Sequence, residues 1–376
     1  MPYHGVISPF GTMLIAVCLG IGMMSMPSSA KQKKKVDDSW GRGVYRGANV
    51  SSARLNVDDY RVLRSWGADH IRYQLAKYNA PTTEKDGEVT FSDATWQSVD
   101  TAIDQARQAG LKVLIDLHQG GTFFPVVGDG WWKPANIVSW VDPKCKQRLI
   151  SFWQNVARHY VNERGTIIGY DILNEPGPPK NAEGAAAWNA IVVDVVKAIR
   201  EIDTYHTIVI EPAYFGGPDG LAYLKPVDDP NVVYSFHMYF PHQFTHQGLS
   251  AEWPFGVVYP GPIKLQPNTE PVMVDRKWVE HMMKDAVDFQ KRTKTRIYVG
   301  EFSALRYTPE QSSSRYIKDL LDIFEANNWS WCYHAFREWY GWDAEMCNDE
   351  KCKIRHQSTD RLDLLKTYFA KGMKKP

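Results

Sequence analysis

The sequence predicts an α/β fold, a (β/α)8 barrel in a single domain, and three observations carry this prediction. Apolar segments of strand length alternate with amphipathic segments of helix length along almost the whole chain. Eight apolar segments can be counted, which is the number of strands that closes such a barrel. The length of 376 residues suits one barrel, because α/β barrels run to about 250 residues or more as one domain. A doubly wound sheet is the alternative, but it rarely needs eight consecutive right-handed units.

The predicted strands are short apolar runs that loop or turn residues interrupt. The fourth run, Ile167–Asn174, is broken only by Gly169 and Asp171, and Pro176 ends it because proline cannot continue a hydrogen-bonded ladder. In chain order the eight strands are Arg46–Val50, His70–Leu75, Leu111–His118, Ile167–Asn174, Thr207–Glu211, Val232–Tyr239, Arg296–Phe302 and Ser330–Phe336.

The segments between the strands carry apolar residues at helical spacing. Gly67 and Gly110 follow the first two of them, and glycine is the preferred residue just beyond a helix. In chain order the predicted helices are Val57–Trp66, Ala94–Ala109, Cys145–Asn162, Ala185–Ile202, Lys277–Arg292, a helix within Pro309–Asn327, and Arg361–Ala370.

Two connections, Gln119–Pro143 and Phe240–Asp275, are much longer than the usual few residues. Both follow the carboxyl end of a strand, which is the face where barrel enzymes keep their active sites. Both are rich in aromatic side chains, which suggests walls of a binding cleft. The alternative is that these side chains pack against each other and cover the barrel. The aromatic residues are Phe123, Phe124, Trp131, Trp132 and Trp140 in the first loop, and Phe244, Trp253, Phe255 and Tyr259 in the second.

Charge and composition narrow the classes of partner. The 44 basic and 43 acidic side chains nearly cancel, so no nucleic-acid partner is expected. Aromatic residues make up 13% of the chain, with 14 Trp. A large core explains part of this content, and Trp also suits flat, ring-shaped ligands because indole combines apolar area with one donor.

The amino terminus carries a predicted export signal. Met13–Met24 is an apolar run of signal-peptide length, shorter than the roughly 20 residues that a spanning helix needs. Ser28–Ala30 fits the small-residue cleavage pattern, but no Lys or Arg precedes the apolar run and the basic cluster Lys31–Lys35 follows it. We therefore expect a secreted or periplasmic protein, with an uncleaved membrane anchor as the alternative. The predicted organisation is a signal peptide over 1–30, a basic and polar lead-in over 31–40 and the barrel domain over 41–376.

Four cysteines would remain after cleavage of the signal: Cys145, Cys332, Cys347 and Cys352. The last two bracket Asn348–Lys351, and in an exported protein that spacing could close a small disulfide loop. We find no CxxC pair and no His/Cys cluster in the sequence, so we expect no structural zinc site.

Polar side chains stand at or near the carboxyl ends of the predicted strands. A polar residue inside an apolar strand costs free energy unless it has a partner. A single buried histidine is more often a satisfied core residue than a functional one, but seven polar residues at comparable positions are hard to explain as separate features of a core. These residues are Arg72, His118, Asn174, Glu175, His237, Tyr239 and Glu301.

Two of these residues form a candidate catalytic pair. Glu175 and Glu301 end the fourth and seventh strands, which a barrel places on opposite sides. Paired carboxyl groups flanking one bond are what glycoside hydrolysis needs: one protonates the leaving oxygen, and the other attacks the anomeric carbon or activates water. The two groups need different pKa values, which their surroundings set.

The neighbouring residues predict which glutamate is ionised. Arg72, if it lies near Glu301, would hold that carboxylate ionised, and Tyr239 could donate a hydrogen bond to it. Glu175 stands beside the neutral Asn174 and is expected near His237, so it can stay protonated.

The segments Asp171–Pro176 (Asp-Ile-Leu-Asn-Glu-Pro) and Val299–Phe302 (Val-Gly-Glu-Phe) resemble glycoside hydrolase family 5, the cellulase-type members of the clan with catalytic glutamates on strands four and seven. The resemblance covers the chain from about Gly47 to Ala370. Asn-Glu-Pro alone is moderately specific, whereas all the motifs in this order and spacing are strongly specific. The remaining matches are Arg72 in His-Ile-Arg-Tyr, His118 in Asp-Leu-His-Gln, and His237 and Tyr239 in His-Met-Tyr.

The resemblance implies a retaining mechanism in which Glu175 is the acid/base and Glu301 is the nucleophile, with carboxyl groups roughly 5 to 5.5 Å apart. It also implies that Asn174 binds the sugar 2-hydroxyl and that His118 binds another hydroxyl of the same ring. Family members usually place a Trp after strand eight as a sugar platform, and the choice here is Trp339, with Trp342 as the alternative.

Two further acids stand near these positions. Glu338, next to Trp339, departs from the family pattern and could read a hydroxyl or merely pair with Arg337. Glu211 ends the fifth strand and could contact a hydroxyl or form a structural ion pair. The departure at Glu338 puts the substrate in question, not the mechanism.

The leading hypothesis is a secreted, monomeric, retaining endo-β-1,4-glucanase of the cellulase type that needs no cofactor and no metal and acts on a polysaccharide or oligosaccharide. The same mechanism on β-mannan, xyloglucan or β-1,3-glucan stays open, as does exo action, because the long loops could close one end of a cleft. A non-catalytic carbohydrate-binding barrel is a hypothesis of another class, and the presence of both glutamates argues against it. A metal-dependent barrel hydrolase predicts His-x-His at a strand end, which the sequence lacks there.

Overall fold

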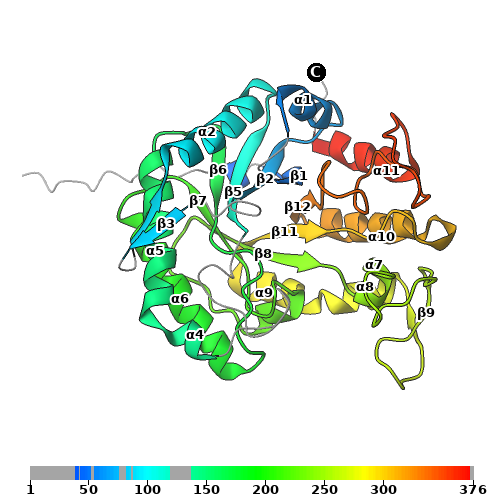
Figure 1. The fold of residues 1–376 in the computed structure, drawn as a ribbon. Helices are drawn as coiled ribbons and strands as arrows, with labels where there is room; N and C mark the ends of the chain where they lie inside the picture. Colours follow the sequence, from blue (N-terminus) through cyan, green and yellow to red (C-terminus); the bar gives the residue numbers. More distant parts are fainter. Residues whose placement is uncertain are drawn as a thin grey trace, which may run out of the picture. The chain divides into compact units, whose positions relative to one another are not determined.

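In the described part of the chain, eight parallel strands close into a barrel in the computed structural model (Figure 1). The strands follow one another around the barrel in chain order, and the last pairs with the first. This arrangement confirms the (β/α)8 prediction. The barrel strands are β1 (Arg46–Ser51), β2 (His70–Leu75), β5 (Lys112–Leu117), β6 (Ile167–Asp171), β7 (Thr207–Ile210), β8 (Val232–Met238), β11 (Arg296–Phe302) and β12 (Ser330–Tyr333).

The structure describes residues 39–372, apart from 42, 52–54, 76–81, 86–87 and 119–136. The predicted signal peptide and most of the first long loop, with Phe123, Phe124, Trp131 and Trp132, lie outside the described residues. Among the described helices, none combines the length and the apolar character needed to cross a membrane.

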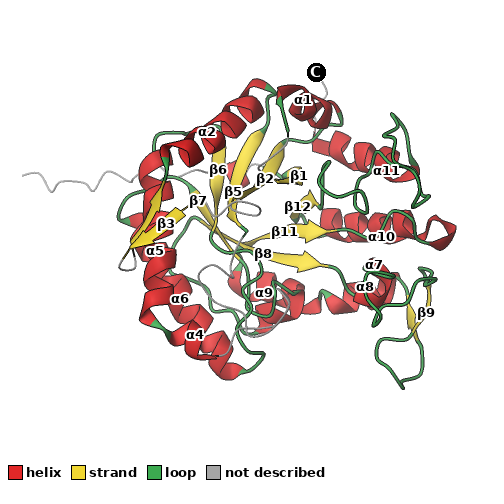
Figure 2. Cartoon of the chain, viewed as in Figure 1, coloured by secondary structure: helices red, strands yellow, loops and turns green. Residues whose placement is uncertain are grey.

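Helices surround the strands, as Figure 2 shows by colour. Their apolar faces pack onto the barrel and form the larger core, which includes Trp153, Trp188 and Trp329, all fully buried. The helices are α1 (Val57–Ser65), α2 (Asp93–Gln108), α4 (Ile137–Val141), α5 (Pro143–Tyr160), α6 (Ala182–Arg200), α7 (His242–Thr245), α8 (Arg276–Met282), α9 (Lys284–Thr293), α10 (Ser312–Ala326) and α11 (Asp360–Phe369).

One predicted helix is wrong in detail, and one connection of the barrel lacks a regular helix. The predicted helix Lys277–Arg292 is two helices, α8 and α9, because the fully buried Met283 leaves the helical region with φ −96° and ψ 8°. After β7, a short 3-10 turn over Pro218–Ala222 stands where a regular barrel has a helix. Pro218 at its start and Gly220 within it are poor helix formers, which accounts for the short turn.

Two small hairpins interrupt the strand–helix alternation, and the sequence did not predict either of them. The first pairs β3 (Thr82–Lys85) with β4 (Glu88–Phe91) after β2. The second pairs β9 (Gly261–Ile263) with β10 (Val272–Val274) inside the long loop after β8. In this loop Phe244 and Tyr259 are fully buried, whereas Phe255 is 56% exposed. Part of the aromatic content of this loop is therefore core.

A second, smaller core, made of strand residues together with Trp40 from before β1, lies inside the barrel. Trp40 packs against Tyr298 and donates its indole N–H to the carbonyl of Ile168 at 2.8 Å. Barrels are filled by such layers of inward-facing side chains. The members of this core are Trp40, Leu114, Ile168, Val209, Val233, Tyr298 and Cys332.

The fourth strand is shorter than predicted. β6 ends at Asp171, but Asn174 N–H still donates to the carbonyl of Leu117 at 2.9 Å. This contact carries the chain past the ladder and places Asn174 and Glu175 beyond the strand end.

Candidate active site

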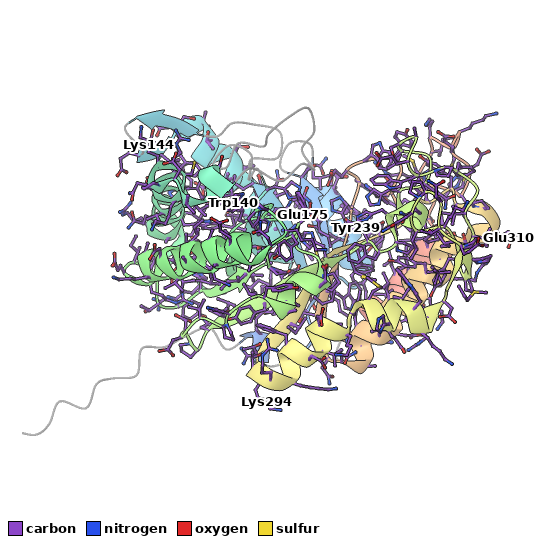
Figure 3. The ribbon with its side chains drawn as sticks, turned by 90° about the horizontal axis from the view of Figure 1, so that it is seen from below. Trp140, Lys144, Glu175, Tyr239, Lys294 and Glu310 are labelled. Atoms are coloured by element: carbon purple, nitrogen blue, oxygen red, sulfur yellow. The ribbon has the colours of Figure 1, made fainter. Side chains whose placement is uncertain are left out.

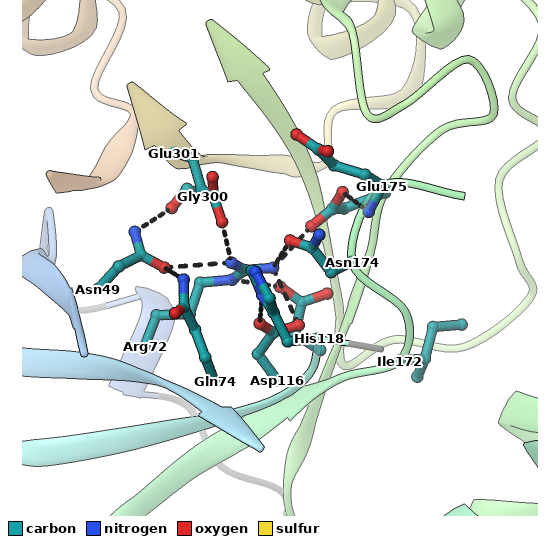
Figure 4. Close-up of polar contacts among 12 residues, drawn as sticks. Asn49, Arg72, Gln74, Asp116, His118, Ile172, Asn174, Glu175, Gly300 and Glu301 are labelled. Atoms are coloured by element: carbon teal, nitrogen blue, oxygen red, sulfur yellow. Dashed lines mark hydrogen bonds and ion pairs between the residues drawn. The ribbon is translucent and has the colours of Figure 1, made fainter. Parts of the chain in front are cut away.

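The predicted polar residues converge around Arg72, which lies at the centre of the site (Figure 4). Its guanidinium is fully buried and forms ion pairs with four carboxylates, each at 2.8–3.0 Å. It also donates to the side-chain oxygens of Asn49 and Asn174, both at 3.1 Å. The four carboxylates are Asp116, Asp171, Glu211 and Glu301.

One arginine cannot neutralise four charged carboxylates, so some of these acids must be protonated at neutral pH. Burial raises the pKa of Asp116 to about 8 and raises the pKa of Asp171 well above its usual range. Burial would also raise the pKa of Glu211, but the charge of His237 and a hydrogen bond to it lower that pKa instead. Of the four carboxyl groups around Arg72, Glu211 and Glu301 are therefore the ones that are mainly ionised.

We expect Arg72→Ala to lower the free energy of unfolding by about 3–5 kcal/mol, because it leaves buried carboxylates without their cation. Arg61→Ala is the matched control, since Arg61 pairs with Asp58 on the surface and exposed pairs contribute at most about 1 kcal/mol. The measurement is the midpoint of urea unfolding for both variants. Equal midpoints would show that Arg72 does not organise the site.

Glu301 is turned toward Arg72 by an irregularity in β11. The register between β8 and β11 shifts between Val299 and Glu301, which is the mark of a β-bulge at Gly300. A side chain at Gly300 would meet the Nε2 of His237 at 2.9 Å, so only glycine fits there. The carbonyl of Gly300 accepts a hydrogen bond from the amide of Asn49 at 2.8 Å, which fixes the bulge.

The surroundings of Glu301 favour its ionised form. Arg72 donates to Oε1 at 2.8 Å, and the hydroxyl of Tyr239 donates to Oε2 at 2.9 Å. Burial alone would raise the pKa of Glu301, but the charges of His334 and His237 hold that pKa well below its usual range. The charge of Arg72 lowers it further. Glu301 is therefore a carboxylate at neutral pH.

Glu175 is held in an uncommon backbone conformation. Its φ of 48° lies in the left-handed region, which costs a non-glycine residue free energy and persists only where the surroundings impose it. The imposing contact is the N–H of Glu175, which donates to Oε2 of Glu211 at 2.8 Å. Glu211 thus forms a structural ion pair with Arg72 and at the same time positions Glu175.

The surroundings of Glu175 favour its protonated form. Burial raises its pKa above the usual value, although a hydrogen bond of 2.9 Å to Nδ1 of His237 opposes the rise. The side chain keeps 19% exposure, so it can reach a ligand. In Figure 3 the labelled Glu175 and Tyr239 lie near the middle of the view, whereas Lys294 and Glu310 lie toward its edges.

The two glutamates are close together. One carboxylate oxygen of Glu175, one of Glu301 and one ring nitrogen of His237 all lie within 4.8 Å of one another. The site therefore pairs a proton-bearing acid with an ionised carboxylate at a spacing that can flank a single bond.

The family model described as Cellulase (glycosyl hydrolase family 5) matches residues 46–338. This range covers the barrel from β1 to the end of β12 and includes both glutamates. The chain belongs to glycosyl hydrolase family 5. It is therefore a glycoside hydrolase, as the strand-end motifs indicated.

Similar proteins of this family span nearly the whole barrel. Endoglucanase C of Acetivibrio thermocellus is 26% identical over 337 residues, which cover 83% of this chain and 92% of that protein. Cellodextrinase A of Ruminococcus flavefaciens is 25% identical over 316 residues, which cover 79% of this chain and 87% of that protein. The structure of Thermotoga maritima Cel5A with cellobiose aligns with a TM-score of 0.69 and 24% identity over 87% of this chain and 99% of that one, and this enzyme has also been solved with mannotriose.

The other predicted site residues surround the pair. His118 contacts Asp116 through Nδ1 at 2.8 Å, and the amide oxygen of Asn174 is taken by Arg72. Trp342, rather than the first-choice Trp339, lies against the residues that contact Glu301: its ring is 6.2 Å from that of Tyr239. Trp339 packs against Trp342 instead, with 5.3 Å between their ring centroids.

Pairing with Arg337 was one of the two alternatives for Glu338. Arg337 donates to Glu345 and Asp59. The contact of Glu338 with a hydroxyl group of the substrate stays a prediction.

Four further residues, which were not predicted from the sequence, contact the predicted residues of the site: Asn49, Asp116, Asp171 and His334. His334 lies 3.3 Å from Oε2 of Glu301 through Nδ1. Each of the four carries the same signal as the predicted residues, a polar side chain inside or directly after an apolar strand, and that signal could have found them.

Proposed function

We propose that the chain is a retaining endo-glycanase that cleaves β-1,4-glucan by double displacement, with Glu301 as the nucleophile and Glu175 as the acid/base. The observation that carries the proposal is that one oxygen of Glu175 lies within 4.8 Å of one oxygen of Glu301, in surroundings that raise the pKa of Glu175 and lower the pKa of Glu301. Retaining enzymes keep these groups about 5–5.5 Å apart, whereas inverting enzymes need about 6.5–9.5 Å to fit a water molecule.

In the first step, a carboxylate oxygen of Glu301 attacks the anomeric carbon while the bond to the leaving oxygen breaks. The proton of Glu175 moves to that oxygen, which leaves as an alcohol, and Glu175 becomes a carboxylate. In the second step Glu175 takes a proton from water, and the hydroxide oxygen bonds to the anomeric carbon. The ester bond to Glu301 breaks, so both side chains return to their starting states.

His237 supports Glu175 when it changes from an acid in the first step to a base in the second. Burial would lower the pKa of His237, but the charges of Glu211 and Glu301 raise it well above its usual value, so the imidazole carries a positive charge. This charge lies 2.9 Å from Oε1 of Glu175 and stabilises the carboxylate that forms in the first step.

The names of the relatives favour a glucan substrate. Endoglucanase C and cellodextrinase A both carry names for β-glucan hydrolases, and the mannotriose complex of Cel5A keeps β-mannan as a second candidate. We further propose that the protein is exported, on the basis of its amino-terminal apolar run and small-residue cleavage pattern.

The test is product analysis on soluble cellulose, β-mannan, xyloglucan and β-1,3-glucan, with the first product followed by proton NMR. We expect the β-anomer to appear before mutarotation, because two displacements at one carbon restore its configuration. We also expect a rapid fall in the chain length of cellulose, which is the sign of endo action. An α-anomer formed first would overturn the retaining mechanism, and release of single small sugars at constant chain length would overturn endo action.

A further inference from the structure

A second cluster of ligating side chains lies in the loop after β12, outside the two-glutamate site. Cys347, Cys352 and His356 each bring one ligand atom within 4.8 Å of the other two. No zinc site is expected from the sequence, because the chain has no CxxC pair and its His and Cys residues do not form an obvious motif. The three ligands instead follow the spacing Cys-x4-Cys-x3-His, which the fold closes into one group.

The distance between one sulfur and the imidazole nitrogen of this cluster matches the geometry of a zinc site. Zn–S bonds of about 2.3 Å and Zn–N bonds of about 2.0–2.1 Å at a tetrahedral angle separate sulfur and nitrogen by about 3.6 Å. The observed distance from Sγ of Cys352 to Nε2 of His356 is 3.6 Å. The two cysteines are free thiols in the structure, so both sulfurs are available to a metal.

The backbone holds the three ligands together without a metal. Met346 and Arg355 form an isolated antiparallel bridge, and His356 N–H donates to the carbonyl of Glu345 at 2.7 Å. Both contacts bring the two arms of the loop side by side at the cluster. The N–H of Cys347 donates to Sγ of Cys352 at 3.3 Å, and such hydrogen bonds to sulfur are common supports of metal-bound thiolates.

Arg306 fixes the turn between the two cysteines. This arginine is fully buried, and its guanidinium donates to four carbonyl groups of the turn. The acceptors belong to Cys347, Asp349, Glu350 and Cys352. A turn held in this way loses little conformational entropy when its side chains bind an ion.

We propose that Cys347, Cys352 and His356 form a structural site for a soft divalent cation of the Zn²⁺ class. Thiolates and imidazoles are ligands that zinc takes in proteins, and water or an outside donor would complete four-coordination here. The bound ion would lock the loop that carries Trp339 and Trp342. The site is independent of hydrolysis, because neither glutamate takes part in it.

The test uses the full chain, reduced with a phosphine, stripped of metal with a chelator and dialysed against Zn²⁺. We expect about one Zn²⁺ per chain by mass spectrometry of the metal content, and Co²⁺ in its place should give thiolate charge-transfer absorption and strong tetrahedral visible bands. Cys352→Ser and His356→Ala should lose the ion and the bands. His281→Ala, which removes another exposed histidine, should keep both.

Limited trypsin digestion gives a second readout, because Lys351 and Lys353 lie inside the loop. Zn²⁺ should slow cleavage there by about tenfold in the parent chain, since a metal that binds the closed loop suppresses its opening, and it should have no effect in Cys352→Ser. A reduced parent chain that takes up no Zn²⁺ would overturn the proposal. Zn²⁺ uptake that survives both Cys352→Ser and His356→Ala would also overturn it, because the ion would then lie elsewhere.

Discussion

Glu301→Ala is expected to lower kcat for glucan hydrolysis by about 10⁵-fold, a loss like those found when other hydrolases lose their nucleophile. The physical reason is that no other carboxylate can replace it. Glu211 and Asp116 are held by Arg72, and Glu175 is protonated. Sugar binding should remain, because the aromatic and amide groups around the site are unchanged. The measurements are initial rates on soluble cellulose and calorimetric titration with a cello-oligosaccharide.

Glu201→Ala is the matched control, since Glu201 is exposed at the end of α6 and should leave the rate unchanged. A small anion such as azide should partly rescue Glu301→Ala on an activated aryl glucoside, because it can enter the space of the lost carboxylate and attack the anomeric carbon. Hydrolysis of glucan within tenfold of the parent rate would exclude Glu301 as the nucleophile.

The barrel and the glutamate pair could be predicted because the strand pattern repeats along the chain and the motifs follow in a fixed order. Eight apolar runs alternate with helical ones, and each run by itself identifies a strand. Glu175 and Glu301 then follow from their place at the ends of strands four and seven, since the geometry of a closed barrel brings those ends together. No detailed packing is needed for that step.

The network that sets the protonation states was only partly predictable. Arg72 and Tyr239 were expected beside Glu301, and both contact it. His334 and Asn49 could have been noted as polar residues in or after apolar strands, but their contacts depend on distances across the barrel and on the bulge at Gly300, which the alternation of residues along β11 does not reveal.

Loop residues were the least predictable. The choice between Trp339 and Trp342 depends on how the chain folds back after β12, and two tryptophans three residues apart give the same sequence signal. The ligand cluster in the same loop was missed for the same reason. Its members come together through the Met346–Arg355 bridge, a contact within the loop that spacing alone does not specify.

Glu175→Ala is expected to have an effect that depends on the leaving group. On glucan, whose leaving alcohol needs a proton, kcat/KM should fall by about 10³–10⁴-fold. On an aryl glucoside with an acidic phenol it should fall by less than about tenfold, because that phenolate leaves without help. The ratio kcat/KM is the proper measure, since it reports the first displacement. Equal losses on both substrates would refute the acid role.

The pH dependence gives a separate check on the same residue. In the parent enzyme Glu175 must be protonated, so kcat/KM is lost as pH rises through its raised pKa. Glu301 must be ionised, and because its pKa is lowered, activity on the acidic side is lost only well below the usual range of a carboxyl group. In Glu175→Ala the alkaline fall should disappear on the aryl glucoside, while the acidic fall remains. An alkaline fall that stays in place would assign it to another group, and His237, with its raised pKa and its contact with Glu175, would be the residue to substitute next.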